Sequence, residues 1–396
     1  MTPPVDISAD TAFETPAAAA PRAGRRPAAP RAGRRPAGID AADIDHCREA
    51  IRHGSLSFHA ASRLLPARFR DPALALYAFC RLADDAVDLQ EEKVAAVLRL
   101  KERLDLVYAG RPRNAPTDRA FTAMVEQVEM PRALPEALLE GLAWDAMGRR
   151  YHTLEDLHAY SARVASAVGV MMAVIMGVRD GHALARACDL GVAMQLTNIA
   201  RDVGEDARAH RVYLPLDWLD AARIDPENFL HDPTPDDAIR AMVRRLLGEA
   251  RRLYSRGADG VGALPVACRP GILAARHIYS GIGADIARAG HDSVSRRAHT
   301  TAGQKLGWLA LSGMQAVGVG LMPRAATYYA EPLPACRFLV DAAAHPRHAA
   351  AGPWGEGRAG DLVALFADLK ARDARRRART GGQQPVSAAP RPMAAE

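Results

Sequence analysis

The chain has 396 residues, a mass of 42.5 kDa and a formal net charge of +6, so it is long enough to bury a sizeable core. The positive charge is concentrated at the ends: six arginines lie in two copies of the repeat PRAGRRPA, at 21–28 and 30–37, and five more lie between 372 and 379. The middle of the chain is near neutral, only 5% of all residues are aromatic, and no recognition motif accompanies the basic ends. These features argue against nucleic acid as a partner.

Both ends of the chain differ in composition from the middle. Residues 1–40 are rich in Ala, Pro and Arg and predict a disordered arm, because they hold too little apolar mass to offset the entropy of ordering. Residues 41–345 predict one all-α domain, and residues 346–396 predict a C-terminal helix and a basic disordered tail. Breaks rich in Pro and Gly fall at 111–118, 130–135, 224–237 and 267–271. The basic ends either solubilise the chain or contact anionic lipid head groups.

The first acidic cluster lies in a helix predicted over about 72–94. Asp84, Asp85 and Asp88 occur in RLADDAVD, and Arg81 precedes Asp84 by three residues. Residues four apart are neighbours on a helix surface, so Asp84 and Asp88 share one face. The apolar flanks predict that this stretch is largely buried.

A helix predicted over 155–178 separates this cluster from the second one. It carries Tyr160, Gly169 and Gly177 among Ala, Val and Met residues. Small residues leave room either for a close neighbouring helix or for an elongated apolar ligand, and both interpretations stay open.

The second acidic cluster lies in a helix predicted over about 182–208. Asn198, Asp202 and Asp206 repeat the spacing of four, Arg201 precedes Asp202, and Arg211 follows in RVYLP. Buried like charges are costly unless cations or metal ions neutralise them. Two such faces meeting at a cavity predict a site for several Mg²⁺ ions, whose arginines grip a diphosphate. For either cluster alone, a solvated helix face or internal salt bridges would be an equally good interpretation.

A diphosphate held at the mouth of an apolar cavity indicates ionisation of an allylic diphosphate. Metal and guanidinium groups stabilise the leaving diphosphate, and a water-free cavity protects the remaining carbocation.

The stretch 306–322, LGWLALSGMQAVGVGLM, is the most apolar late segment. It is shorter than the roughly 20 residues of a spanning helix and contains four glycines, so it predicts a buried or interfacial helix, with membrane contact as an alternative. The five cysteines form no CxxC pair, the histidines show no zinc spacing, and the N-terminus lacks a continuous apolar core. These features predict a cytoplasmic protein, with peripheral contact at the inner face of the membrane as the alternative.

The segments that carry this chemistry resemble those of the squalene and phytoene synthase family. YAFCRLADDAVD at 77–88 and GVAMQLTNIARDVGEDARAHRVYLP at 191–215 are similar to the two signatures of the family. Further segments that resemble the family are HGSLSFHAASRLLP at 53–66, YSARVASAVG at 160–169 and ARHIYSGIGADIARAGHDSVSRRA at 275–298. The resemblance covers roughly 46–305 and implies the isoprenoid synthase helical fold with a central active-site cavity.

The resemblance also implies roles for single residues. The implied ligands of Mg²⁺, with Mn²⁺ as an alternative, are Asp84, Asp85, Asp88, Asn198, Asp202 and Asp206. The implied substrate-binding residues are Ser57, Phe58, Tyr77, Arg81, Gln195, Arg201, Arg211, Tyr213, Tyr279 and Arg296, and Tyr160 joins the aspartates as a catalytic residue. One departure is Leu56, where many family members carry a basic residue.

The motifs are most similar to the bacterial phytoene synthase branch of the family. That branch implies head-to-head condensation of two geranylgeranyl diphosphates, through a cyclopropyl diphosphate, to phytoene, without NADPH. Two alternatives stay open: a squalene or dehydrosqualene synthase using farnesyl diphosphate, and a non-catalytic helical protein that binds metal or a partner. A head-to-tail prenyltransferase or terpene cyclase is disfavoured by RDVGED followed by RVYLP.

Overall fold

A computed structural model describes residues 38–54, 62–88, 93–319 and 323–345, all within one compact unit that spans 37–396. Within these ranges the chain forms helices and no strand, which confirms the predicted all-α class. The α-helices are α1 (Ala41–Gly54), α3 (Ala67–Asp88), α4 (Lys93–Tyr108), α5 (Pro116–Val128), α6 (Ala133–Ala146), α7 (Leu154–Ser161), α8 (Ala167–Ile175), α9 (Gly181–Arg208), α10 (Leu216–Ala221), α11 (Pro226–His231), α12 (Asp237–Asp259), α13 (Arg269–Arg288), α14 (Ala302–Gly318) and α15 (Arg337–Ala344). A π-helical turn, η1 (Ala162–Ser166), joins α7 to α8, and 3₁₀ turns are η2 (Val261–Ala263), η3 (Val266–Cys268), η4 (Ala326–Tyr329) and η5 (Pro334–Cys336).

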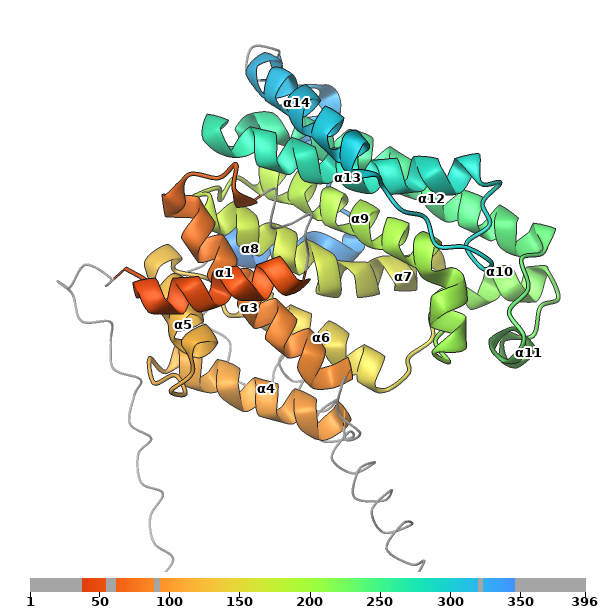
Figure 1. Cartoon of the computed structure of the whole chain (residues 1–396), viewed down its shortest axis with the longest axis horizontal. Helices are drawn as coiled ribbons and strands as arrows, with labels where there is room; N and C mark the ends of the chain where they lie inside the picture. Colours follow the sequence, from red (N-terminus) through yellow and green to blue (C-terminus); the bar gives the residue numbers. More distant parts are fainter. Residues whose placement is uncertain (1–37, 55–61, 89–92, 320–322, 346–396) are drawn as a thin grey trace, which may run out of the picture. The chain divides into compact units, whose positions relative to one another are not determined.

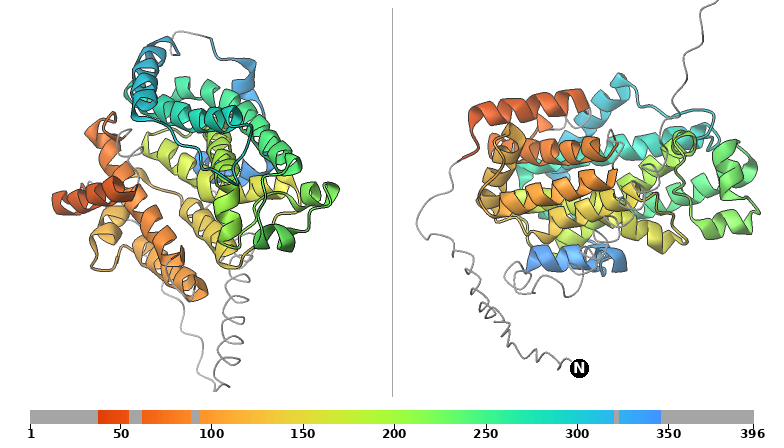
Figure 2. Two further views of the ribbon diagram at one scale, coloured as in Figure 1. Left: turned by 45° about the vertical axis from the view of Figure 1, so that its right-hand side comes forward. Right: turned by 90° about the horizontal axis from the view of Figure 1, so that it is seen from below.

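The helices are arranged around α9. Figure 1 shows α9, with α7 and α8 beside it, between a group formed by α1 and α3 to α6 and a group formed by α12, α13 and α14. The left-hand view of Figure 2 shows the same order, with α14 on the outer side of α13. Helix α9 contacts α8, α12 and α13 directly, so both of its long sides are covered by protein.

Helix α9 forms where the sequence predicts it. Asp180 accepts a hydrogen bond from the backbone N of Ala183, which caps the first turn. Its middle is buried and approaches η1 closely: a Cβ on Gly191 would lie 2.6 Å from Cα of Ser166. Glycine therefore allows the two helices to touch, and the Ser166 hydroxyl donates to the carbonyl of Cys188 at 2.8 Å across this contact.

The segment Leu154–Ile175 is long and apolar enough to cross a membrane by length and composition. However, 67% of its apolar window is buried within the protein, as in a core helix. The sequence predicts one helix over 155–178, whereas the structure divides it into α7, η1 and α8. A π turn adds one residue to the helical repeat without changing the apolar pattern, so the pattern does not reveal it.

Other predicted boundaries shift by a few residues. The first acidic helix begins at Ala67 instead of about residue 72, because Pro72 is accommodated inside it. It is described as far as Asp88, and residues 89–92 of the predicted range lie outside the described residues. The predicted break at 224–237 contains the short helix α11. The predicted N-terminal arm up to residue 37 and the predicted C-terminal helix and tail at 346–396 lie outside the described residues.

Candidate active site

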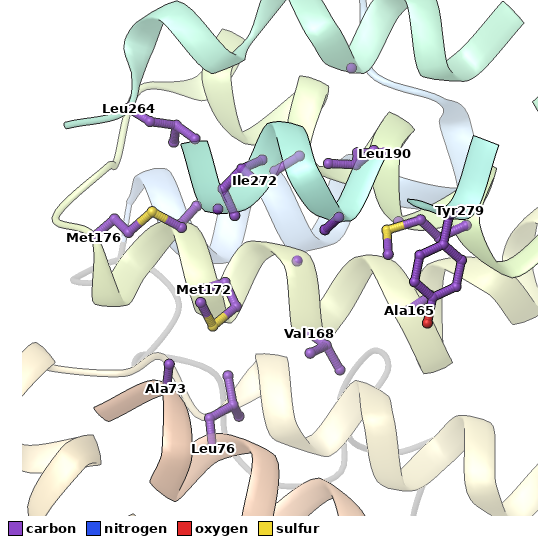
Figure 3. Close-up of a pocket in the computed structure, with 18 of the residues that line it drawn as sticks. Ala73, Leu76, Ala165, Val168, Met172, Met176, Leu190, Leu264, Ile272 and Tyr279 are labelled. Carbon is purple, nitrogen blue, oxygen red and sulfur yellow. The ribbon is translucent and has the colours of Figure 1, made fainter. Parts of the chain in front are cut away.

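An apolar cavity of about 380 Å³ lies between α3, α8, α9 and α13 (Figure 3). Leu76 of α3, Val168 and Met172 of α8, Leu190 of α9 and Ile272 of α13 form its walls. Its volume falls within the range typical of small-molecule sites, and its lining suits an elongated apolar ligand. Gly169, one of the two glycines in the predicted helix, therefore lines the cavity and also lies against Ala187 of α9, whereas Gly177 is not part of the lining.

The two ends of the cavity differ in character. Figure 3 shows Met176 and Leu264 at one end and Tyr279 at the other. Gln195 and Asn198 also line the cavity, and α9 continues from them to the second acidic cluster. The Tyr279 end is therefore the polar end.

The first acidic cluster lies in the last turns of α3. Nη2 of Arg81 is 2.7 Å from Oδ1 of Asp85, and Nη1 of Arg81 is 3.6 Å from Oδ2 of Asp84. The three side chains are 45%, 39% and 50% exposed in that order, so the prediction that this cluster is largely buried is wrong. These exposures place the described turns of α3 around Arg81, Asp84 and Asp85 at the protein surface. Asp88 lies in the same turn, but its side chain is outside the described residues.

Asp202 in the second cluster is held by two arginines. Arg201 binds it through two nitrogens, at 2.8 and 2.5 Å, and Nε of Arg297 lies 2.8 Å from its Oδ1. Burial alone would raise the pKa of Asp202, but these hydrogen bonds outweigh it and lower that pKa. Asp202 is therefore ionised and neutralised before any ligand arrives.

Asp206 lies one turn further along α9. Its Oδ1 is 3.8 Å from Nε of Arg211. Burial raises the pKa of Asp206 to about 7, and the nearby carboxylates of Asp202 and Glu205 reinforce the shift against the attraction of Arg211. A cation bound beside Asp206 would stabilise the ionised form of this carboxyl group.

Tyr77 and Tyr279 connect the two clusters across the polar end of the cavity. Both tyrosines line the cavity, and the charges of Arg81, Asp84 and Asp85 act on the pKa of Tyr77, whereas those of Arg201 and Asp202 act on the pKa of Tyr279. Burial raises the pKa of both phenols. Segments more than a hundred residues apart thus meet at one site.

The loop between α13 and α14 brings a further arginine to the second cluster. A Cβ on Gly204 would lie 2.4 Å from the carbonyl oxygen of Val294, so glycine is required for this loop to lie against α9. From the loop Arg297 reaches Asp202, whereas Arg296 binds Asp285 at 3.1 Å. The structure thus favours Arg297 over the predicted Arg296 as the arginine at this cluster.

Asp145, near the end of α6, was not among the predicted residues. It accepts hydrogen bonds from the hydroxyls of Tyr160 and Tyr213, each at 2.8 Å. The rings of Tyr160 and Tyr213 stack with centroids 5.3 Å apart, and Tyr151 packs 5.0 Å from Tyr160. Burial raises the pKa of Tyr160 and Tyr213, so both stay protonated donors. An acidic residue beside Trp144 near the end of the apolar segment LLEGLAWDA was the available sequence signal.

Oxygen atoms suited to a divalent ion lie at the polar end. Oδ1 of Asn198 is buried and has no hydrogen-bond partner, which is the state of an oxygen that a cation would satisfy. Across the described residues no group of three or more His, Cys, Asp or Glu side chains converges on a metal position. A cation bound beside Asn198 would therefore need phosphate oxygens to complete its shell. Ser57 and Phe58 lie outside the described residues.

Comparison with known proteins gives one consistent result. The family model described as squalene/phytoene synthase matches residues 51–304. The chain is 59% identical to a phytoene synthase of Rhodobacter capsulatus, over 85% of this chain and 98% of that protein, and 60% identical to one of Cereibacter sphaeroides, over 85% and 96%. A solved dehydrosqualene synthase, in complex with a ligand, superposes with a TM-score of 0.64 at 26% identity, covering 70% of this chain and 97% of that one.

Proposed function

The chain belongs to the squalene/phytoene synthase family, and on that basis we propose that it joins two geranylgeranyl diphosphates head to head to give phytoene. One observation carries the proposal: an apolar cavity has paired Asp and Arg clusters and two tyrosines at its polar end. Such a cavity holds a prenyl chain, and its polar end holds the diphosphate.

We propose Mg²⁺ as the cofactor, with Mn²⁺ as an alternative. Its ligands would be Asp84, Asp85, Asp88, Asn198, Asp202 and Asp206, and the oxygen of Asn198 without a partner supports this. When bound, the ions neutralise charge on the departing diphosphate.

The arginines at the polar end bind and orient the diphosphate. Arg81 forms a salt bridge with Asp85 of the first cluster, and Arg201 and Arg297 both bind Asp202 of the second. Guanidinium groups match phosphate oxygens in a forked geometry and stabilise the charge that develops as the carbon–oxygen bond breaks. Arg211, beside Asp206, extends the same positive edge.

The apolar walls and the tyrosines govern the fate of the carbocation. Leu76, Val168 and Met172 exclude water, which would otherwise capture the cation as an alcohol. The double bond of the second substrate attacks it, and loss of a proton gives a cyclopropyl diphosphate. Ionisation, rearrangement and loss of a second proton then give phytoene. Asp145 fixes the hydroxyls of Tyr160 and Tyr213 by hydrogen bonds, so their oxygen dipoles keep a constant direction during these steps.

The decisive experiment offers geranylgeranyl and farnesyl diphosphate separately to the purified chain, with Mg²⁺ and without NADPH. A C40 hydrocarbon from geranylgeranyl diphosphate alone, identified by mass, is the expected result. A C30 product would keep the chemistry but assign the farnesyl branch, to which the superposed dehydrosqualene synthase belongs by its name. Absence of product from both would leave the non-catalytic reading of the acidic clusters.

We also propose a cytoplasmic location with peripheral membrane contact. The five cysteines are free and four of them are buried, which suits a reducing compartment.

A further inference from the structure

A second cavity, of about 350 Å³, lies between α9, α12 and α13. Thr197 of α9 and Tyr254 of α12 are buried and line its inner part, whereas Arg251 is exposed and lies where the cavity reaches the surface. It shares no lining residue with the cavity of the proposed active site, although α9 and α13 contribute to both. The second cavity is therefore a separate space and does not extend the first.

The walls of the second cavity are mostly apolar. Its small lining residues are Ala250, Gly283, Ala284 and Ala287. At the inner part, the hydroxyls of Thr197 and Tyr254 lie 2.9 Å apart, and that of Thr197 donates to the carbonyl of Ala193 at 2.8 Å. These polar atoms therefore satisfy one another, and the space in front of them suits an apolar group. Protein interiors contain few voids larger than a water molecule, so a cavity of this size has room for a small ligand.

Positive charge gathers at the outer part of this cavity. Arg244 and Arg251 are both exposed and lie seven residues, or two helical turns, apart on one face of α12. Burial lowers the pKa of His291, and the charges of Arg244 and Arg251 lower it further, so the ring lies within electrostatic reach of both guanidinium groups. Nδ1 of His291 is buried and has no hydrogen-bond partner among the described residues. An anion bound here would favour the protonated ring and offset the repulsion between the cations.

No carboxylate neutralises these two arginines. The carboxylates adjacent in sequence to this site are Glu249, Asp285 and Asp292, and each forms a salt bridge with an arginine other than Arg244 and Arg251. Within the part of the chain that the structure describes, neither Arg244 nor Arg251 forms a salt bridge. The arginines of the proposed active site are paired with aspartates, so the outer part of the second cavity is the more electropositive place for an anion without metal.

We propose that the second cavity binds a phosphorylated molecule with a short apolar chain. The chain would occupy the space between Ala250 and Ala284, and the phosphate would bind Arg251 and Arg244 at the surface. Guanidinium groups match phosphate oxygens in a forked geometry, and the apolar walls exclude a ligand that is polar throughout. An isoprenoid phosphate and a straight-chain lipid phosphate share this chemistry. The site goes beyond the proposed function, because binding here requires neither metal nor the proposed substrate.

The test is calorimetric titration of the full chain with geranyl phosphate and with decyl phosphate, in the presence of a chelator. We expect a binding event that Arg251→Gln weakens about tenfold or more, because charge-assisted hydrogen bonds to the phosphate are lost. Ala284→Leu should weaken the same event by narrowing the cavity, and Ala284 is exposed, so the fold tolerates the larger side chain. Tighter binding of geranyl phosphate would assign an isoprenoid source of the ligand, and tighter binding of decyl phosphate a lipid source.

Arg252→Gln is the matched control. It removes the same charge from the next position of α12, but Arg252 binds Glu249 and does not line the cavity, so binding should match that of the unmodified chain. Arg81→Gln alters the proposed active site and should lower turnover while leaving this binding event unchanged, so the two proposals fail separately. The second site would be overturned if Arg251→Gln bound like the unmodified chain, or if Arg81→Gln abolished all binding. Equal binding of geraniol would overturn the role of the phosphate.

Discussion

Asp202 shares one carboxylate between Arg201 and Arg297, so its removal changes both arginines at once. We expect Asp202→Asn to lower turnover roughly 10²- to 10³-fold, because a metal ligand and the anchor of two phosphate-binding groups are lost together. The measurement is steady-state product formation with Mg²⁺, with circular dichroism to show that the helices remain. Glu205→Gln is the matched control, since Glu205 also contacts Arg297, at 3.1 Å, but is 57% exposed. Near-normal turnover of Asp202→Asn would refute the assigned role and support a structural one.

Asp206 makes the stability of the metal-free protein depend on pH. Burial raises its pKa to about 7, whereas an unfolded aspartate titrates near 4. Between these values the unfolded chain holds fewer protons, so this group lowers the free energy of unfolding as the pH rises through the window. Asp206→Asn should therefore gain stability relative to the unmodified protein between pH 5 and pH 8, by about 1–3 kcal/mol.

Thermal unfolding at both pH values, in the presence of a chelator, tests this expectation. Addition of Mg²⁺ with inorganic diphosphate should reverse the gain, because the negatively charged carboxylate binds the cation more strongly than the neutral amide of asparagine. A difference that stays constant from pH 5 to pH 8 would contradict the raised pKa.

Two neighbouring tyrosines give a matched pair of substitutions. The hydroxyl of Tyr151 is buried without a hydrogen-bond partner, whereas that of Tyr160 donates to Asp145. Tyr160→Phe should lower the free energy of unfolding by about 1–3 kcal/mol and turnover about tenfold, since a half-buried carboxylate loses a donor. Tyr151→Phe should be neutral or stabilising in the same two measurements. The reverse order would show that Asp145 does not position the Tyr160 hydroxyl.

Helix α9 supplies the clearest case in which packing shapes the site. Gly204 lets the loop that carries Arg297 lie on the helix, because any side chain would meet the backbone of Val294. Gly204→Ala should lower the free energy of unfolding by about 1–3 kcal/mol and weaken binding of Mg²⁺ with inorganic diphosphate, measured by calorimetry. Gly248→Ala on α12 meets nothing within 4 Å and should instead stabilise the protein by about 0.5–1 kcal/mol. Equal effects of the two alanines would rule out the contact with Val294 as the cause.

The sequence predicts the helices better than the contacts between them. Helix α9 lies within a residue of its predicted range, because a long amphipathic pattern is local information. The choice of Arg297 over Arg296 depends on how a loop meets Gly204, and the role of Asp145 depends on α6 meeting Tyr160 and Tyr213. Neither contact produces a periodic pattern in the sequence from which it could be predicted. The sequence predicts that the first cluster is largely buried because its neighbours are apolar, whereas its side chains are partly exposed in the structure.

Much of the positive charge of the chain lies outside the residues that carry the proposed chemistry. The six arginines of the two N-terminal repeats lie within residues 1–36, which precede in sequence all the residues that line the cavity. Removal of residues 1–36 should therefore leave turnover in detergent within a factor of about two. The same truncation should weaken binding to anionic vesicles at low salt, since each basic residue near the surface adds roughly 1 kcal/mol. A collapse of turnover in detergent would show that these residues contribute to the site.

The pairing of aspartates with arginines leaves the ligand-free site electrically balanced. A divalent ion arriving alone meets carboxylates already neutralised by Arg81, Arg201 and Arg297, and a diphosphate arriving alone meets arginines already occupied by carboxylates. When both ligands bind, the metal ion takes the carboxylates and so frees the arginines for the diphosphate. The diphosphate takes the arginines and so frees the carboxylates for the metal ion. Metal and diphosphate should therefore show reciprocal thermodynamic coupling, in which each raises the affinity of the site for the other by the same factor.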